Sequence, residues 1–322
     1  MKNGFPASSC RSSGKISAGR KKLQTQSLIL FISTMAIFGT IGVFRRSIPL
    51  PSSVLAFVRG LLGSLVLLIF VLIRKRIGKG NAGNADFQIS RSNFIKLIVS
   101  GIVMGFNWIL LFEAYSYTTV AIATLCYYME PTILILVSPV IFQEKLTPKK
   151  LLCATVAILG MVFVSGAFEG GSAAGSDLKG ILLGLGAAAL YATVVIINNT
   201  ITGVDAYRKT MIQLASAAAI MIPYILLTED LSQLVFSRAA VLMLLLVGIV
   251  HTGMAYAMYF GSMEGLKVQT IALFSYIDPI VALILSAWIL KEPLSIYGIA
   301  GAVLIIGAAV FSELDWKPGQ NP

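Results

Sequence analysis

Two carboxylates, Glu130 and Asp278, lie near the centres of long apolar runs, and each is followed by a proline, Pro131 or Pro279. An ionisable side chain at the centre of a membrane-length segment costs about 2.5–3.5 kcal/mol to insert, so such residues usually have a function. Proline removes a backbone N–H and loosens the helix, which frees carbonyl oxygens beside the carboxylate. The pattern predicts a cation or proton site at mid-membrane. The alternative is a pair of carboxylates that only hold helices together.

Aromatic side chains flank both carboxylates. Helical spacing places Tyr127 on the same face as Glu130. Tyr128 and Tyr276 occupy matching positions, each two residues before its carboxylate. An aromatic ring beside a carboxylate suits an ammonium group or a planar organic molecule. We therefore expect these tyrosines to help bind substrate or protons, the alternative being ordinary packing.

Five further residues within apolar runs are candidates for the same site. His251 is the only histidine, and it could be a proton switch or a neutral hydrogen-bonding group. Arg59 could pair with Glu113 or extend to the outer surface, and we favour a structural pair. Asn107 and Trp108 are expected to line a cavity.

The composition indicates a membrane protein. The chain is 57% hydrophobic and only 12% charged, with a mean hydropathy of +0.86, whereas soluble domains contain about 25% charged residues. The net charge of +11 does not indicate nucleic-acid binding, because the basic residues lie in a polar head and in short loops between apolar runs. Residues 1–26 lack the apolar core of a cleaved signal peptide, so the first apolar run is expected to stay as a membrane helix.

Catalytic and metal-binding patterns are missing from the sequence. There is no Gly-x-x-x-x-Gly-Lys-Ser/Thr loop, so ATP is not expected to drive the protein. Cys10, Cys126 and Cys153 lack the spacing of a metal site or a disulfide framework. We expect no cofactor, no metal and no enzymatic activity.

Apolar runs of about 17–25 residues can cross a bilayer as helices, and they predict an all-α membrane protein with ten transmembrane helices. Of the 25 Lys and Arg residues, 19 lie in segments on the side of the N-terminus, five lie in loops on the other side, and Arg59 lies within a run. This bias predicts cytoplasmic termini and a location in the cytoplasmic membrane. The runs lie at about 27–44, 52–73, 95–117, 119–142, 149–168, 179–199, 207–228, 239–261, 269–290 and 296–313.

The chain contains an internal repeat. Residues 105–163 pair with residues 253–311 at an offset of 148 without a gap, and the two Tyr-x-acid-Pro motifs coincide. Five runs separate the copies, and an odd number inverts the second copy in the membrane. We therefore expect two inverted five-helix repeats. The expected organisation is a basic tail at 1–26, repeats at 27–168 and 179–313, and a second tail at 314–322.

Short motifs add a resemblance to a known family. Phe38-Gly39-Thr40, Phe57-Val58-Arg59, Gln143-Glu144-Lys145-Leu146 and Lys291-Glu292-Pro293-Leu294 occur within or at the ends of the apolar runs. Together with the ten runs and the paired prolines, they resemble the EamA-type branch of the drug/metabolite transporter superfamily. The resemblance covers about residues 27–313. It implies a secondary transporter of small metabolites, with a central cavity lined by both halves.

The expected function is transport of an amino acid, amine or drug-like compound by alternating access, coupled to protons and with efflux favoured over uptake. Glu130 and Asp278 would bind the substrate amine or a proton in turn. The alternatives are a facilitative carrier or exchanger without proton coupling, or a membrane scaffold that transports nothing. The expected partners are a small-molecule substrate, protons and the lipid bilayer. Substrate identity, direction, coupling ion, oligomeric state and the role of the N-terminal tail stay open.

Overall fold

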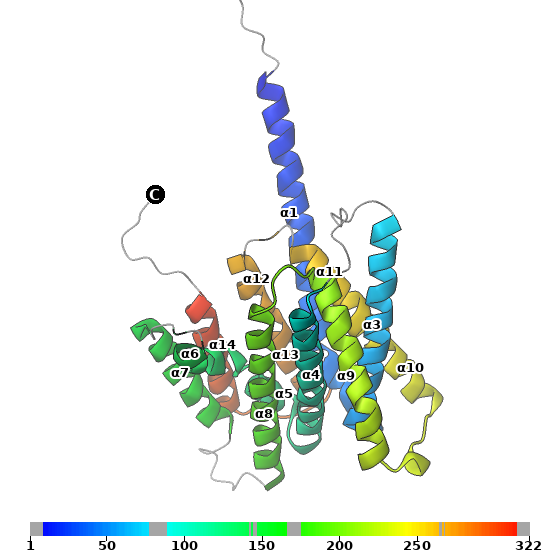
Figure 1. Ribbon diagram of the computed structural model, residues 1–322. Helices are drawn as coiled ribbons and strands as arrows, with labels where there is room; N and C mark the ends of the chain where they lie inside the picture. The colour runs from blue at the N-terminus through cyan, green and yellow to red at the C-terminus, as the bar shows by residue number, and fades with distance from the viewer. Residues whose placement is uncertain are drawn as a thin grey trace, which may run out of the picture.

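The computed structural model describes residues 9–76, 89–141, 143, 147–165, 175–263, 266 and 268–313, and this part of the chain contains helices and no strand (Figure 1). The first half contains α1 (Ser9–Gly39), α2 (Ile41–Ser47), α3 (Ser52–Arg76), α4 (Arg91–Tyr117), α5 (Val120–Tyr127), α6 (Glu130–Ile141) and α7 (Pro148–Val164). The second half contains α8 (Gly175–Asn199), α9 (Ala206–Thr228), the 3₁₀ turn η1 (Leu231–Gln233), α10 (Arg238–Leu246), the π-helix η2 (Val247–Met254), α11 (Ala255–Met263), α12 (Val268–Ser275), α13 (Ile277–Trp288) and α14 (Ile296–Glu313).

The all-α membrane architecture is confirmed. Each expected run is mostly helical over its described residues, and α1 begins at Ser9, within the expected N-terminal tail. Seven helical stretches of the described chain are long and apolar enough to cross a membrane. The stretches Leu273–Trp288 and Ile296–Ser312 are shorter, as is α7 with 17 residues, so the total of ten crossings stays a prediction. The expected tail at 314–322 lies outside the described residues, as does most of the motif at 143–146.

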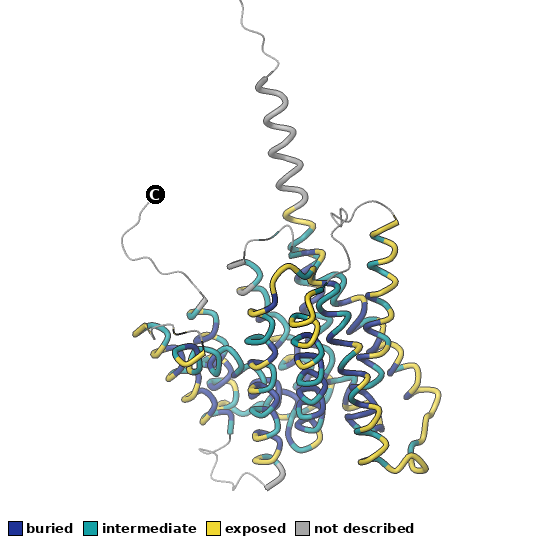
Figure 2. Tube along the Cα trace, in the orientation of Figure 1, coloured by how far each residue is buried: buried dark blue, intermediate teal, exposed yellow. Residues whose placement is uncertain are grey.

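Exposed positions recur along the outer helices of the bundle (Figure 2), and many of them are large apolar residues. Leu227 is 85% exposed, and Leu182 and Val303 are also exposed. A water-soluble protein rarely exposes this many large apolar side chains. These faces match the hydrocarbon of a bilayer, so the protein is an integral membrane protein.

The two carboxylate–proline motifs interrupt their helices. α5 ends at Tyr127 and α6 begins at Glu130, so Pro131 falls in the first turn of α6, where no N–H is needed. In the same way, α12 ends at Ser275 and Pro279 falls in the first turn of α13. Both expected continuous runs are thus broken helices, and the carboxylates lie at the breaks.

A third irregularity was not expected. The run at 239–261 contains η2, whose backbone is wound as a π-helix around His251. The Thr252 hydroxyl donates to the Val247 carbonyl, five residues earlier, at 3.0 Å. π-helical turns inside α-helices occur frequently at functional sites.

Helices from the two halves pack against each other throughout the bundle. α3 packs on α9, α7 on α14, and α5 on α13. α4 packs on α8 and α9, while η2 packs on α3 and α11 on α1. The first and last described helical ends, the N-terminal part of α1 and the C-terminal end of α14, lie on the same side of the bundle (Figure 1).

Candidate functional site

A central cavity of about 520 Å³ lies between the two halves of the bundle. Its volume is in the range of small-molecule binding sites. Nine of the residues expected in the site line it: Arg59, Trp108, Tyr127, Tyr128, Glu130, Pro131, His251, Tyr276 and Asp278. The structure therefore brings most of the predicted set into one space.

A hydrogen bond across the two halves defines the acidic end of the cavity. The Tyr128 hydroxyl, at the end of α5, donates to Asp278 Oδ2 in α13 at 2.7 Å. The ring of Tyr276 lies 6.3 Å from that of Tyr128. Glu130 lies within electrostatic range of Tyr127 and of a further tyrosine, Tyr191. Both carboxylates are therefore surrounded by aromatic rings and phenol groups, at the two helix breaks.

Further aromatic rings extend this lining. Tyr191 of α8 contacts Tyr127 with 5.6 Å between ring centroids. Phe38 lies 5.5 Å from Tyr256 and 6.3 Å from Tyr259. Tyr191 and Tyr259 were not predicted, because a single aromatic residue in an apolar run looks the same whether it packs against lipid, a helix or a cavity. Knowledge of the helix faces would have been needed to find them.

Arg59 gives the same cavity a basic end, opposite in charge to the acidic end at Asp278 and Glu130. Its guanidinium carbon lies 4.3 Å from the centroid of the Trp108 ring and 5.2 Å from that of Phe112. Its Nε donates to the Thr252 hydroxyl at 3.1 Å. The expected pair with Glu113 is not formed, because stacking on Trp108 turns Arg59 inward. Glu113 does not line the cavity and instead lies within electrostatic range of Arg45.

His251 lies beside this basic end. Its Nε2 is 2.6 Å from the Thr40 hydroxyl, and its ring meets the Phe44 ring at 4.7 Å in an edge-on contact. Its Nδ1 is buried and has no hydrogen-bond partner among the described residues. Because the Thr40 hydroxyl donates its proton to the Ile37 carbonyl at 2.7 Å, Nε2 carries the proton that Thr40 accepts, and the buried Nδ1 holds a lone pair.

Two other predicted residues lie outside the cavity. The Asn107 amide donates to the Ala187 carbonyl at 2.6 Å and is fully buried, so it joins α4 to α8. Pro279 is buried in the first turn of α13 and does not line the cavity. Their positions explain local structure, and neither reaches the space where a ligand would lie.

A polar group that the sequence did not reveal completes the lining at the α8–α9 junction. The Gln213 amide nitrogen donates to the Ser100 hydroxyl at 2.6 Å and to Asn198 Oδ1 at 2.8 Å. Gln213, Asn198 and Thr210 line the cavity. Nothing in the order of residues along α9 distinguishes Gln213 from a surface glutamine.

The Phe38-Gly39-Thr40 motif links three parts of the site. Phe38 contacts the tyrosines of α11, and Thr40 contacts His251. A Cβ added to Gly39 would lie 2.5 Å from the Asp278 carbonyl oxygen and 2.8 Å from Val281 Cβ. Only glycine allows α1 to approach the start of α13 so closely, so this motif fixes the position of Asp278.

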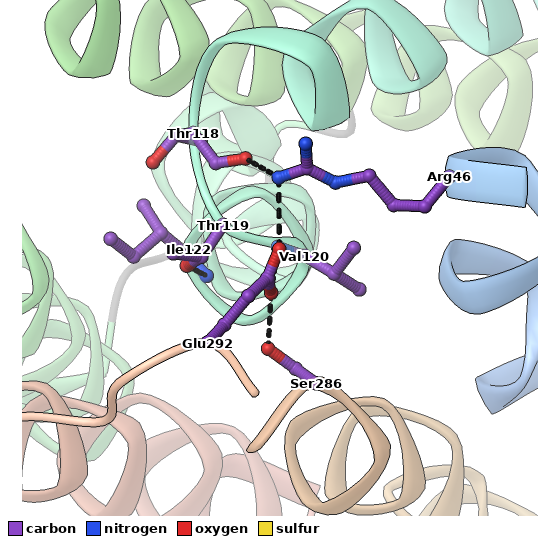
Figure 3. A network of polar contacts seen from close by, with 7 residues as sticks. All are labelled: Arg46, Thr118, Thr119, Val120, Ile122, Ser286 and Glu292. Atoms are coloured by element: carbon purple, nitrogen blue, oxygen red, sulfur yellow. Dashed lines mark hydrogen bonds and ion pairs between the residues drawn. The ribbon is translucent and has the colours of Figure 1, made fainter. Parts of the chain in front are cut away.

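On the other side of the bundle, a polar network closes the space between the halves (Figure 3). Glu292 forms an ion pair with Arg46 at 2.8 Å, accepts from the Val120 backbone N–H at 2.8 Å, and accepts from the Ser286 hydroxyl. Arg46 also donates to the Thr118 carbonyl at 2.9 Å. We call these five residues the polar latch. It joins α2, the α4–α5 junction and the α13–α14 junction.

Comparison with known proteins identifies the family to which the chain belongs. The chain matches the EamA-like transporter family twice, over residues 25–166 and 178–313. It belongs to the EamA-like transporter family. The two matches divide the chain into two repeats, and the cavity lies between them.

Relatives of this EamA-like protein span nearly its whole length. "Uncharacterized transporter YxxF" of Bacillus subtilis is 29% identical over 88% of each chain. An "uncharacterized transporter" of Archaeoglobus fulgidus is 22% identical over 87% of this chain and 94% of its own. A solved crystal structure shares the fold, with a TM-score of 0.62 and 19% identity over 90% of this chain and 97% of its own.

A glycine substitution tests the contact that positions Asp278. In Gly39→Ala, the new methyl group must displace α1 from α13, and overpacking of this kind costs about 1–3 kcal/mol. We expect a lower melting temperature in detergent. The matched control is Gly307→Ala, which meets no atom within 4 Å and should be neutral or stabilising because glycine is unfavourable inside helices. Equal melting temperatures for both variants would contradict the close approach.

The polar latch is tested by a double-mutant cycle. Glu292→Ala removes three interactions, whereas Arg46→Ala removes the ion pair and one hydrogen bond, so the glutamate variant should be less stable. Because Arg46 is 37% exposed at its side chain, we expect a coupling energy of only about 0.2–1 kcal/mol. Thermal or denaturant unfolding of the four proteins measures it. Strictly additive effects would show that the ion pair contributes nothing.

Proposed function

We propose that this EamA-like protein is a secondary transporter of a small amino acid, amine or drug-like compound. It works by alternating access, exchanges substrate for protons, and serves efflux. The observation that carries the proposal is the cavity between the two repeats, with Asp278 of one repeat bonded to Tyr128 of the other. A ligand that binds there touches both halves at once, as alternating access requires.

The helix contacts support an inverted repeat. If the first five expected spans exchange with the last five, then the contact of α4 with α8 corresponds to that of α11 with α1, and the contact of α4 with α9 corresponds to that of η2 with α3. Both members of each pair of contacts are present. The same exchange maps the pairs α3–α9 and α7–α14 onto themselves, and the helices within each pair pack together. This is the contact pattern of a pseudo-two-fold axis between the repeats.

The two ends of α4 mark the two sides of the protein. At its start, Asn93 donates to the Thr202 carbonyl at the α8–α9 junction. At its end, Thr118 belongs to the polar latch. The cavity lining reaches Asn198 and Gln213 at the first side and includes no latch residue. We take this as a state that is open at the α8–α9 side and closed at the latch.

The open side is rich in basic residues. Arg74, Lys75 and Arg76 end α3, and Lys96 donates to the Thr200 carbonyl near the α8–α9 junction. Because cytoplasmic loops carry an excess of Lys and Arg, we propose that this side and both termini are cytoplasmic. The cavity would then load from the cytoplasm, which agrees with efflux.

The two carboxylates are the groups at which a proton is exchanged for the substrate. An ionised Asp278 accepts the Tyr128 hydrogen bond and attracts a proton or a substrate ammonium group, and either one neutralises it. Glu130, at the matching helix break, has the same choice. Because a neutral site crosses the low-dielectric interior more easily than a charged one, the halves would exchange shapes only when the carboxylates are neutralised.

Substitution of the carboxylates tests the proposal. Asp278→Asn keeps an oxygen that accepts from Tyr128, so the fold should persist, but it cannot release a proton. In proteoliposomes with an imposed pH gradient, we expect uptake of labelled amino acids or small amines to fall to the level of protein-free vesicles. Glu130→Gln should weaken the pH dependence as well.

The matched control is Asp230→Asn, which changes a carboxylate in an exposed loop far from the cavity lining. It should transport like the unchanged protein. If both cavity variants keep gradient-driven flux, proton exchange by these carboxylates is wrong.

A second candidate follows from the same hydrogen bond. If Tyr128–Asp278 only ties the repeats together, the protein is a facilitative carrier or exchanger without proton coupling. Asp278→Asn would then lower the melting temperature and spare the flux, and an imposed pH gradient would change neither. A scaffold that transports nothing predicts no flux of any compound and leaves the aromatic cavity without a purpose.

A further inference from the structure

Arg59 is a buried cation without a matching anion. Only 7% of the residue is exposed, yet it lines the cavity. The structure gives its guanidinium one hydrogen bond, from Nε to Thr252. No described carboxylate lies within 4 Å of the Arg59 guanidinium nitrogens.

The polar groups within electrostatic range of the Arg59 guanidinium are neutral. They are the hydroxyls of Tyr115, Tyr127 and Tyr256, together with His251. Arg59, Tyr256 and Asp278 all line the cavity. The two charges therefore face the same space without neutralising each other directly.

An arginine cannot relieve this situation by losing its proton. Stacking on Trp108 and Phe112 compensates in part, but a cation–π contact is weaker than a hydrogen-bonded ion pair in a dry site. A buried charge without a partner is unfavourable unless something supplies the partner. The two terminal amino groups of the guanidinium form the planar fork that binds a carboxylate through two hydrogen bonds. Among the described residues, no such carboxylate is present.

We propose that Arg59 forms an anion subsite that binds the carboxylate of an amphoteric substrate. The inference rests on the proposed function and narrows its substrate class to molecules that carry both a carboxylate and an amine. The amine binds at the acidic end, near Asp278 and Glu130. The aromatic rings between the two ends enclose the apolar body of the molecule.

Trp108 provides a direct readout of this subsite. Its ring lies 4.3 Å from the guanidinium carbon, so pairing of Arg59 with an anion changes the electrostatic environment of the indole. The other tryptophans are Trp288, which is 71% exposed, and Trp316. With both changed to phenylalanine, the fluorescence reports on Trp108 alone.

The experiment titrates the full chain, in detergent and in lipid nanodiscs, with four matched probes. Phenylalanine carries both charges, phenylalaninamide and phenethylamine lack the carboxylate, and 3-phenylpropionate lacks the amine. We expect phenylalanine to bind most tightly and 3-phenylpropionate to change Trp108 fluorescence, while the two amines leave it unchanged.

Arg59→Gln should weaken phenylalanine binding about thirtyfold or more, the factor typical when one partner of a buried charge pair is removed. Arg59→Lys keeps the charge without the planar fork and should recover part of the phenylalanine affinity. Thr252→Val is the matched control, since it removes the Nε contact and the bond to the Val247 carbonyl but leaves the guanidinium charge and its fork, and it should lose little affinity. If Arg59→Gln fails to fold, Arg59→Lys and Thr252→Val still separate charge geometry from packing.

Equal binding of phenylalanine and its amide, or carboxylate preference that survives Arg59→Gln, would overturn the subsite. A Trp108 signal from none of the four probes would overturn it too. These outcomes are independent of transport. Carboxylate-selective binding without flux refutes the proposed function alone, and proton-driven flux of amines that ignores Arg59 refutes the subsite alone.

Discussion

The hydrocarbon core of a membrane offers no partner for a polar group, and this constraint shapes the whole protein. Backbone groups must be satisfied by helices, so irregular backbone is tolerated only where it lines a cavity or is buried in protein. The described helices obey this rule at interruptions that lie beside the cavity. The breaks at Glu130 and at Asp278 and the π-helix around His251 all border the central cavity. The position of the cavity follows from where the helices are interrupted.

The side chains obey the same constraint in two different ways. At the acidic end, Asp278 is matched by a phenol donor from the other repeat, and a carboxylate can also take up a proton. At the basic end, Arg59 is held by a ring face and one hydroxyl and cannot lose its charge. The acidic end can therefore be neutral without a ligand, whereas the basic end stays charged. Under the proposals above, proton exchange takes place at the acidic end and anion recognition at the basic end.

Much of this arrangement was predictable from the sequence. The remainder depends on side-chain direction and on packing between distant helices, which a residue pattern does not contain. Hydropathy located the helices, and the Tyr-x-acid-Pro repeat located the two breaks, because proline acts on its own backbone. Hydropathy did not reveal η2, since Val247–Met254 is as apolar as any regular helix. It also could not say which way Arg59 faces, so the pair with Glu113 was wrong. Tyr191 and Gln213 reach the cavity only through packing between distant helices.

The contacts of α5 show how ligand binding and closure can be connected. The Val120 N–H at its start bonds to Glu292, just after α13, and Tyr128 at its end bonds to Asp278, in the first turn of α13. The two helices pack side by side, so polar groups of the second repeat hold α5 at both ends. α13 is a single helix of 12 residues. Under the alternating access proposed above, neutralising Asp278 loosens one end of this pair, and the shift reaches the polar latch through the helix itself. No further relay is needed between the binding site and the closed side.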